Sequence, residues 1–139
     1  IGLAVSLLLI RNIKIGEDDH IDLTPSMHWP TPEFADEIRP DSGPVMITIE
    51  YTVPEENKTE FLRLSRQLKL LRKRDGAFFW EMFNKAGTAN CLVEVFMVNS
   101  WLEHLRQHAR VTVLDKKLQD EIRALHRGES KPKRSHFIA

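Results

Sequence analysis

The sequence has one cysteine, no excess of charge of either sign, and no mainly apolar run longer than ten residues. A single thiol, Cys91, excludes an internal disulfide framework and a multi-cysteine zinc site. Twenty basic residues balance twenty acidic ones, so the chain as a whole is not a polybasic nucleic-acid binder. A hydrophobic content of 42% is typical of a folded protein, and 139 residues predict one domain with additional segments.

The charges and the prolines are unevenly distributed. Residues 17–44 contain eight acidic residues, one arginine and five of the seven prolines. Because proline fixes φ and lacks a backbone N–H, this segment cannot form a regular helix or a central strand. The sequence therefore predicts three parts: a stub over residues 1–16, an acidic, proline-rich linker over 17–44, and a domain over 45–139 with a net charge of +5.

The first ten residues of the stub carry no charge, and Arg11 and Lys14 follow them. A helix that crosses a bilayer needs about 20 apolar residues. Since the chain starts with Ile1 rather than methionine, we interpret the stub as the end of a truncated transmembrane helix. Basic residues directly after such a helix mark its cytoplasmic side. The alternative is a buried strand or helix of a soluble protein.

Residues 45–139 show a readable order of secondary structure. Alternating β-branched and polar residues predict the first strand, and apolar residues three and four apart predict amphipathic helices. Ser100 and Glu103 have the spacing of a capping box at a helix start. The expected elements are a strand over 45–53, a helix over 55–74, strands over 77–85 and 91–99, a helix from Ser100 through His108, a helix over 111–126 and a strand over 135–139. This order predicts an α+β fold of the ferredoxin-like split βαβ type.

The two middle strands are apolar on both faces. In strand 77–85, Phe79 and Phe83 point to one side while Trp80 and Met82 point to the other. Helices cover only one face of such a sheet, so the second apolar face needs another cover. A second copy of the chain would supply it, and the sequence predicts a homodimer in which two sheets pack into a barrel.

Several motifs make the chain resemble a known family. They are VMITIEYTV (45–53), LRKRDGAFFWEMF (71–83), the run from Asn99 to His126, and the linker phrase DLTPSMHWP (22–30). Together they resemble the cytoplasmic C-terminal domain of major facilitator superfamily permeases of the enterobactin-exporter-like efflux branch. That domain is similar to the dimeric α+β barrels of the antibiotic-biosynthesis-monooxygenase type. The resemblance implies an inner-membrane efflux permease with this domain in the cytoplasm and its transport pathway in other, membrane-spanning helices.

Two histidines and a tryptophan are candidates for chemistry on the helix that starts at Ser100. His104 and His108 are four residues apart and share a helix face, which suits two metal ligands, although a third ligand is not evident. The resemblance implies a second role, because an aromatic residue and a histidine near this helix line a pocket in some of the barrels. Trp101 and His108 are the corresponding candidates for a catalytic pair. The alternative is that Trp101 anchors the core and the histidines pack beside it.

Glutamates lie within the strands among apolar neighbours. If Gly87 and Thr88 are the central residues of a two-residue turn, Glu81 faces Glu94 on the neighbouring strand. Two facing carboxylates cannot both ionise cheaply, so they would form a catalytic acid–base pair or a structural salt-bridge cluster, for which arginines across the dimer interface are candidates. We predict one of these two arrangements.

The linker and the domain carry opposite charges. Trp29 and Phe34 are large apolar side chains of the linker, and basic residues gather from Lys69 to Arg74. We expect Trp29 to dock onto the domain near these basic residues, the alternative being a disordered spacer. The basic residues themselves either match the helix dipole or contact lipid headgroups.

The leading functional prediction is a non-catalytic cytosolic dimerisation or regulatory domain of an efflux permease. We expect no enzyme activity because no complete catalytic constellation is visible. We also expect no cofactor, no metal and no nucleic-acid partner. The alternatives are a cofactor-independent monooxygenase-like or small-molecule-binding barrel appended to a permease, and a separate soluble ligand-binding protein.

Overall fold

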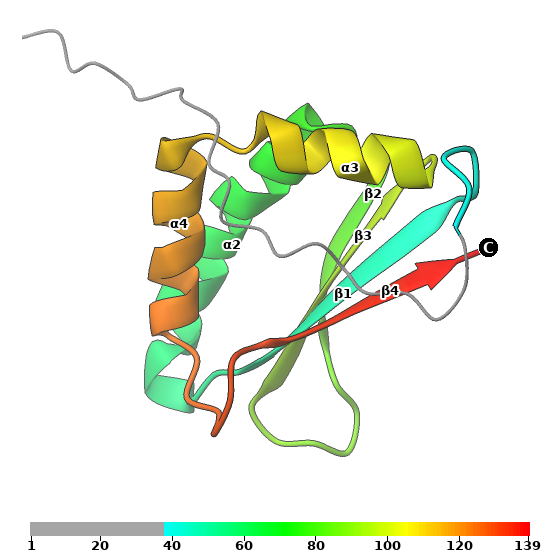
Figure 1. The fold of residues 1–139 in the computed structure, drawn as a ribbon. Helices are drawn as coiled ribbons and strands as arrows, with labels where there is room; N and C mark the ends of the chain where they lie inside the picture. The colour runs from blue at the N-terminus through cyan, green and yellow to red at the C-terminus, as the bar shows by residue number, and fades with distance from the viewer. Residues whose placement is uncertain (1–37) are drawn as a thin grey trace, which may run out of the picture.

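The structure is a computed structural model that describes residues 38–139 (Figure 1). The expectations for the stub, for most of the linker and for Trp29 lie outside the described residues. Within the described part, no helix has the length and apolar character needed to cross a bilayer. The elements are β1 (Val45–Thr52), α2 (Glu55–Arg74), β2 (Phe79–Asn84), β3 (Cys91–Val98), α3 (Trp101–Arg110), α4 (Val113–Ala124) and β4 (Lys133–Ile138).

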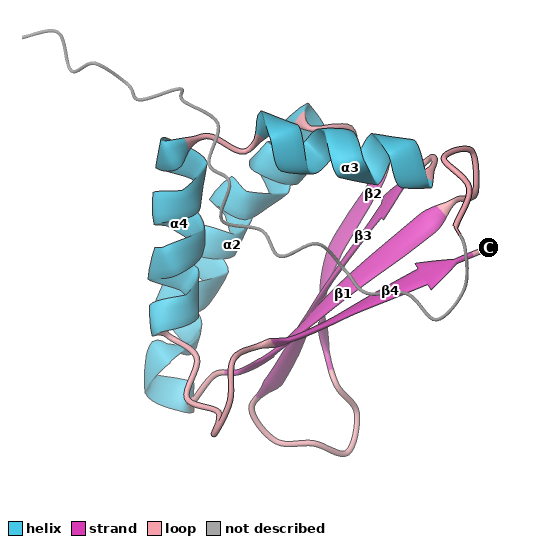
Figure 2. Ribbon diagram, viewed as in Figure 1, coloured by secondary structure: helices cyan, strands magenta, loops and turns pink. Residues whose placement is uncertain are grey.

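The four strands form one antiparallel sheet in the order β2-β3-β1-β4. Figure 2 shows the helices together on one side of this sheet. Alternate residues of β1 point toward the helices and are buried, as the alternation in the sequence predicts. We call this side of the sheet the inner face and the opposite side the outer face. The α+β, ferredoxin-like fold that the sequence predicts is confirmed by this architecture.

The hydrophobic core lies between the inner face and α2. Phe61, Leu64 and Leu68 of α2 are buried because they recur at helical spacing. They pack against inner-face residues such as Ile47 and Phe96. α4 packs against α2, and Ile122 joins the same core.

The starts of α3 and α4 are fixed by side-chain caps. Ser100 accepts a hydrogen bond from the backbone N–H of Glu103 at the start of α3, which is one half of the predicted capping box. The Glu103 carboxylate instead accepts from Arg110 at 2.6 Å. A second cap, not predicted from the sequence, begins α4: Thr112 and Asp115 form a reciprocal capping box. This cap explains why α3 and α4 are separate helices, since Thr112 has extended backbone geometry between them.

The β2–β3 connection differs from the two-residue turn that the sequence suggests. A loop of six residues, 85–90, joins the strands, and Asn90 as well as Gly87 has positive φ. As a result Glu81 lies opposite Val95, and Glu94 lies opposite Met82. The predicted facing pair is therefore wrong, because a register shift of one residue sends the two carboxylates to opposite faces.

Residues 38–44 are held against the domain by backbone hydrogen bonds and by the packing of Ile38. The backbone N–H of Trp101 donates to the Ser42 carbonyl oxygen at 2.7 Å, and Ile38 packs against the core. The backbone N–H of Ala139 donates to the Pro44 carbonyl oxygen, which places the C-terminal end beside the start of β1.

Candidate functional site

Three histidine rings and a tryptophan meet between α3 and the sheet. His104 is 2% exposed and lies on α3, while His136 comes from the inner face of β4. Their Nε2 atoms are 3.1 Å apart. The ring of His108 meets the ring of His104 edge-on, with centroids 4.6 Å apart, and Trp101 lies 5.1 Å from His104. We call these four residues the imidazole cluster.

The hydrogen bonds of the cluster define the tautomers of two rings. His104 Nδ1 lies 3.3 Å from the Oε1 of Gln107, which is an acceptor only, so this nitrogen carries the proton. His104 Nε2 then has a lone pair and accepts from the Nε2–H of His136. The rings thus form one directed chain from His136 through His104 to Gln107.

Both rings of this chain are uncharged at neutral pH. Burial, reinforced by His108 and His136, lowers the pKa of His104 from 6.5 to about 3. Burial and the nearby Arg134 lower the pKa of His136 to about 4. The pair therefore carries no proton charge unless a negative group binds beside it.

The predicted candidates on α3 come together, with one addition. Trp101 and His108, the suggested catalytic pair, both contact the ring of His104. His104 and His108, the suggested metal ligands, meet as perpendicular rings, and the described residues contain no group of three or more ligand-type side chains that could hold a metal ion. His136 was missed from the sequence, because its position in the cluster depends on β4 pairing with β1.

A buried ion pair forms the second polar feature of the inner face. Glu94 is fully buried, and both of its carboxylate oxygens accept from Arg72, at 2.8 and 3.3 Å. The indole N–H of Trp80 donates to the same carboxylate at 3.0 Å. The Arg72 guanidinium also stacks over the ring of Phe96 at 4.4 Å. Of the two arrangements predicted for the glutamates, Glu94 belongs to a cluster with an arginine, and that arginine comes from the same chain.

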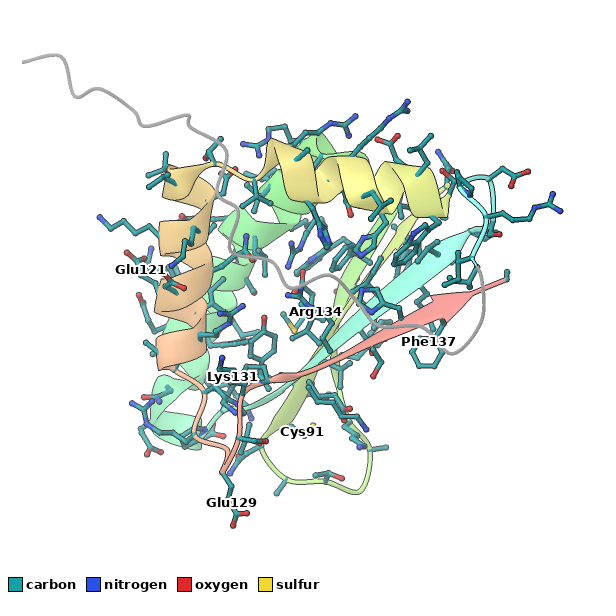
Figure 3. All side chains as sticks on the ribbon, in the orientation of Figure 1. Cys91, Glu121, Glu129, Lys131, Arg134 and Phe137 are labelled. Atoms are coloured by element: carbon teal, nitrogen blue, oxygen red, sulfur yellow. The ribbon has the colours of Figure 1, made fainter. Side chains whose placement is uncertain are left out.

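Tyr51 and Arg134 extend this polar region toward the edge strand β4. Burial, followed by the charge of Glu94, raises the pKa of Tyr51 well above its usual value. Burial and the charge of Arg72 lower the pKa of Arg134 to about 9. Figure 3 shows Arg134 between the sheet and the helices, while Phe137 of the same strand lies on the other side. The inner face therefore combines neutral imidazoles with cationic guanidinium groups.

Glu81 has no part in this region. It lies on the outer face of β2, where its carboxylate accepts from the backbone N–H of Met82 at 3.1 Å. It is exposed, as its position on an uncovered sheet face requires. The candidate role that paired Glu81 with Glu94 has no geometric basis.

The outer face carries a group of apolar side chains that no element of residues 38–139 covers. Phe79, Phe83 and Phe137 are 38, 46 and 51% exposed. Met46, Val93, Val95 and Met97 lie among them and are half-buried. This is the second apolar face that the sequence predicts.

The basic cluster at the end of α2 divides into parts with different partners. Arg72 is directed inward to Glu94, as described above. Arg74 instead bridges Asp75 and Asp115, with nitrogen–oxygen distances of 2.8 Å to each. Lys69 of the same cluster lies over the ring of Trp80, with its Nζ 5.8 Å from the ring centroid.

The whole chain, residues 1–139, matches the family described as "Transmembrane secretion effector", so the protein belongs to this family of the major facilitator superfamily. This confirms the resemblance on which the permease prediction rests. No curated protein matches the sequence.

Solved structures share the fold at low sequence identity. A protein from Caulobacter crescentus described as a "putative antibiotic biosynthesis monooxygenase" is 14% identical, with a TM-score of 0.59 over 71% of this chain and 92% of that one. SnoaB, a cofactor-independent oxygenase from Streptomyces nogalater, is 18% identical, with a TM-score of 0.56 over 68% of this chain and 91% of that one. The described domain thus has the antibiotic-biosynthesis-monooxygenase fold.

These structures correct the prediction that the chain is not an enzyme. That prediction relied on the lack of a complete catalytic constellation in the sequence. It is wrong, because a fold shared with a cofactor-independent oxygenase hosts catalysis without a metal or prosthetic group. It also overlooked His136 and Arg134, which complete the polar inner face only after folding.

Proposed function

We propose that residues 45–139 form the cytosolic C-terminal domain of an efflux permease of the bacterial inner membrane, and that two copies associate through their outer faces to regulate it. Family membership supports the link to a membrane transporter. The single observation that carries the association is the group of apolar residues on the outer face, centred on Phe79 and Phe83.

The outer face has dimensions that suit a sheet-on-sheet interface. Eight residues of β1 at about 3.3 Å each, across four strands about 4.8 Å apart, give a projected area of roughly 500 Å². Protruding phenylalanines make the accessible area larger, so the face approaches the roughly 800 Å² per partner of a stable complex. Exposed aromatic groups of this number are costly in water, since each Å² of apolar surface is worth about 25 cal/mol.

Sedimentation of the whole chain in density-matched detergent tests this association. Phe83→Lys places a charge on the outer face and should convert the dimer to a monomer. Phe78→Lys is the matched control. Phe78 is 53% exposed, but it directly precedes Phe79 of β2, and the alternation of side chains along the strand directs it away from the outer face. A wild-type monomer, or equal effects of the two variants, would refute the proposal.

A second candidate function is cofactor-independent oxidation of a small aromatic molecule at the inner face. The specific observation in its favour is the directed imidazole chain beside Arg134. If an acidic phenol bound there, the guanidinium of Arg134 would stabilise the phenolate anion. The negative charge of the phenolate would raise the pKa of His136, so that its ring accepts the phenol proton. A quinol would then lose two electrons and two protons to O₂, giving a quinone and hydrogen peroxide.

An oxygen electrode tests this candidate. A hydroquinone probe should give protein-dependent oxygen uptake with an equal amount of peroxide, and His136→Gln should abolish it. Thr88→Ala, in the β2–β3 loop, is the control because it lies away from the imidazole cluster. Uptake that persists in His136→Gln, or none in the wild type, excludes this chemistry.

A further inference from the structure

Three helices meet at one end of the domain, where α3 lies across the end of α2 and the start of α4 (Figure 1). The guanidinium of Arg110 donates to the Asp75 carbonyl oxygen at 2.9 Å, which joins α3 to the end of α2. Arg74 donates to the Asp115 carboxylate at 2.8 Å, which joins α2 to the first turn of α4. We call residues 66–78 and 102–118 the α3 end.

The net positive charge of the domain is concentrated at the α3 end. Arg72 is set aside because it is buried against Glu94. The α3 end then contains eight lysines and arginines and three acidic residues, a net charge of +5. The remainder of residues 38–139 is neutral, and extending the α3 end to include Asp120 and Glu121 still leaves +3. The surplus of cations is therefore a property of this end and not of the domain as a whole.

The three acidic residues of the α3 end are already paired with arginines. Asp75 and Asp115 both accept from Arg74, and Glu103 accepts from Arg110 at 2.6 Å. Their negative charges are thus compensated within the domain. Cations that remain at the surface include Arg66, Lys73 and Lys117, which are exposed and form no ion pair within residues 38–139.

Exposed aliphatic side chains lie among these cations. Five of them, from all three helices, are between 39 and 71% exposed: Leu70, Leu102, Leu105, Val113 and Leu114. The two on α3 share the face that points away from the sheet, because the opposite face of this helix is buried. The α3 end therefore presents cations and aliphatic groups together.

This combination fits the surface of an anionic bilayer. Each lysine or arginine near anionic headgroups raises the affinity by roughly fivefold, and aliphatic groups partition into the boundary between headgroups and acyl chains. A nucleic acid would bind the cations but would leave the leucines in water. The family to which the chain belongs is described as transmembrane, which places a bilayer close to this domain.

We propose that the α3 end lies on the bilayer and binds anionic lipid headgroups. Leu102 and Leu105 reach the acyl boundary, while Lys73 and Lys117 contact the headgroups. The chain also enters the domain at this end, since the backbone N–H of Leu102 donates to the Pro40 carbonyl oxygen at 2.9 Å. The α3 end is separate from the outer face, so the inference does not depend on the association of two copies proposed above.

Fluorescence of the whole chain in lipid nanodiscs tests the proposal. Residues 1–10 are uncharged and are expected to partition into any bilayer, so the assay measures the position of α3 rather than total binding. In a Cys91→Ser background, Ala109→Cys on the exposed face of α3 carries a bimane label, and lipids with a nitroxide on the headgroup quench the label on contact.

The label on α3 should respond to lipid charge. Quenching should be at least about threefold stronger in discs with about one third phosphatidylglycerol than in discs of phosphatidylcholine alone. The same label at Thr88→Cys, in the β2–β3 loop at the other end of the domain, should be quenched weakly in both (Figure 1).

Two charge variants separate the α3 end from the rest of the domain. Lys73→Gln/Lys117→Gln should lower quenching at Ala109→Cys in the anionic discs to the level in phosphatidylcholine. Lys131→Gln/Lys133→Gln is the matched control, because it removes the same charge from exposed positions at the other end, where Figure 3 labels Lys131. Circular dichroism confirms that both variants remain folded.

Three results would overturn the proposal. The first is equal quenching of the α3 label in the two kinds of disc, and the second is an equal loss of quenching in the two charge variants. The third is a label that is shielded from soluble iodide but not quenched by the lipid nitroxides, which would show that another protein surface covers α3.

Discussion

Removing the charge of Glu94 should destabilise the domain strongly, because Arg72 would remain buried without its counter-ion. Glu94→Gln keeps the shape of the side chain and an acceptor for the Trp80 indole N–H, which donates to the carboxylate at 3.0 Å. It removes only the negative charge that faces the guanidinium at 2.8 Å. Breaking a buried ion pair on one side typically costs about 3–5 kcal/mol.

The double variant Arg72→Met/Glu94→Gln isolates the free-energy cost of leaving a buried charge without its partner. With both charges of the pair gone, neither partner is left as a buried ion without the other, and methionine fills the space of the arginine stem. We expect the double variant to cost about 1–2 kcal/mol relative to the wild type, less than Glu94→Gln alone. The difference would measure the cost of leaving a charge unpaired rather than the value of the pair.

Urea unfolding followed by far-ultraviolet circular dichroism measures both effects. For a domain of this size, a loss of 3 kcal/mol also lowers Tm by roughly 12–24 °C, which a thermal scan detects. Glu94→Gln costing less than about 1 kcal/mol would refute the reasoning, since a buried guanidinium cannot lose its partner so cheaply. A double variant as unstable as Glu94→Gln would refute it equally.

Three further predictions concern the imidazole cluster and the backbone. Folding lowers the pKa values of His104 and His136, so the unfolded chain binds protons at a higher pH than the folded chain does. The free energy of unfolding should therefore fall as pH decreases from 6.5 toward 4, by up to about 2.7 kcal/mol per pH unit. Unfolding curves at pH 7 and pH 5 measure this change, and equal stability at the two pH values contradicts it. Thr112→Ala removes the α4 cap and should cost about 1 kcal/mol in urea unfolding, whereas the loop variant Thr88→Ala should cost almost nothing. Gly43→Ala should destabilise by about 1–3 kcal/mol, because its Cβ would clash with the Asn99 carbonyl oxygen; unchanged stability would show that this close approach is relieved without cost.

Local patterns were sufficient to predict the order of elements. The helix Glu55–Arg74 follows directly from apolar spacing, and β1 follows from strict alternation. The register of β2 on β3 was not predictable in the same way. Asn90 adopts positive φ without glycine, so the loop is longer than the sequence around Gly87 suggests.

The candidate site depended on pairings that are distant in sequence. Trp101, His104 and His108 lie on one helix and were found by spacing, whereas His136 joins them only because β4 pairs with β1. Arg72 looked like part of a surface cluster, since its neighbours in α2 are basic. Its burial follows from the position of Glu94 on the inner face, where Glu94 lies opposite Ile49 of β1.

The central claim is that two copies meet through their outer faces. Pulsed electron paramagnetic resonance on the whole chain measures the distance between copies. Cys91 is replaced by serine, and a nitroxide label is attached to the cysteine of Glu81→Cys. Glu81 lies exposed on the outer face of β2, so two facing sheets about 10 Å apart should hold the labels within about 30 Å of each other. A label at Lys116 on α4 lies on the helix side and should give a clearly longer distance. Absence of dipolar coupling at Glu81, or a shorter distance at Lys116, would contradict the claim.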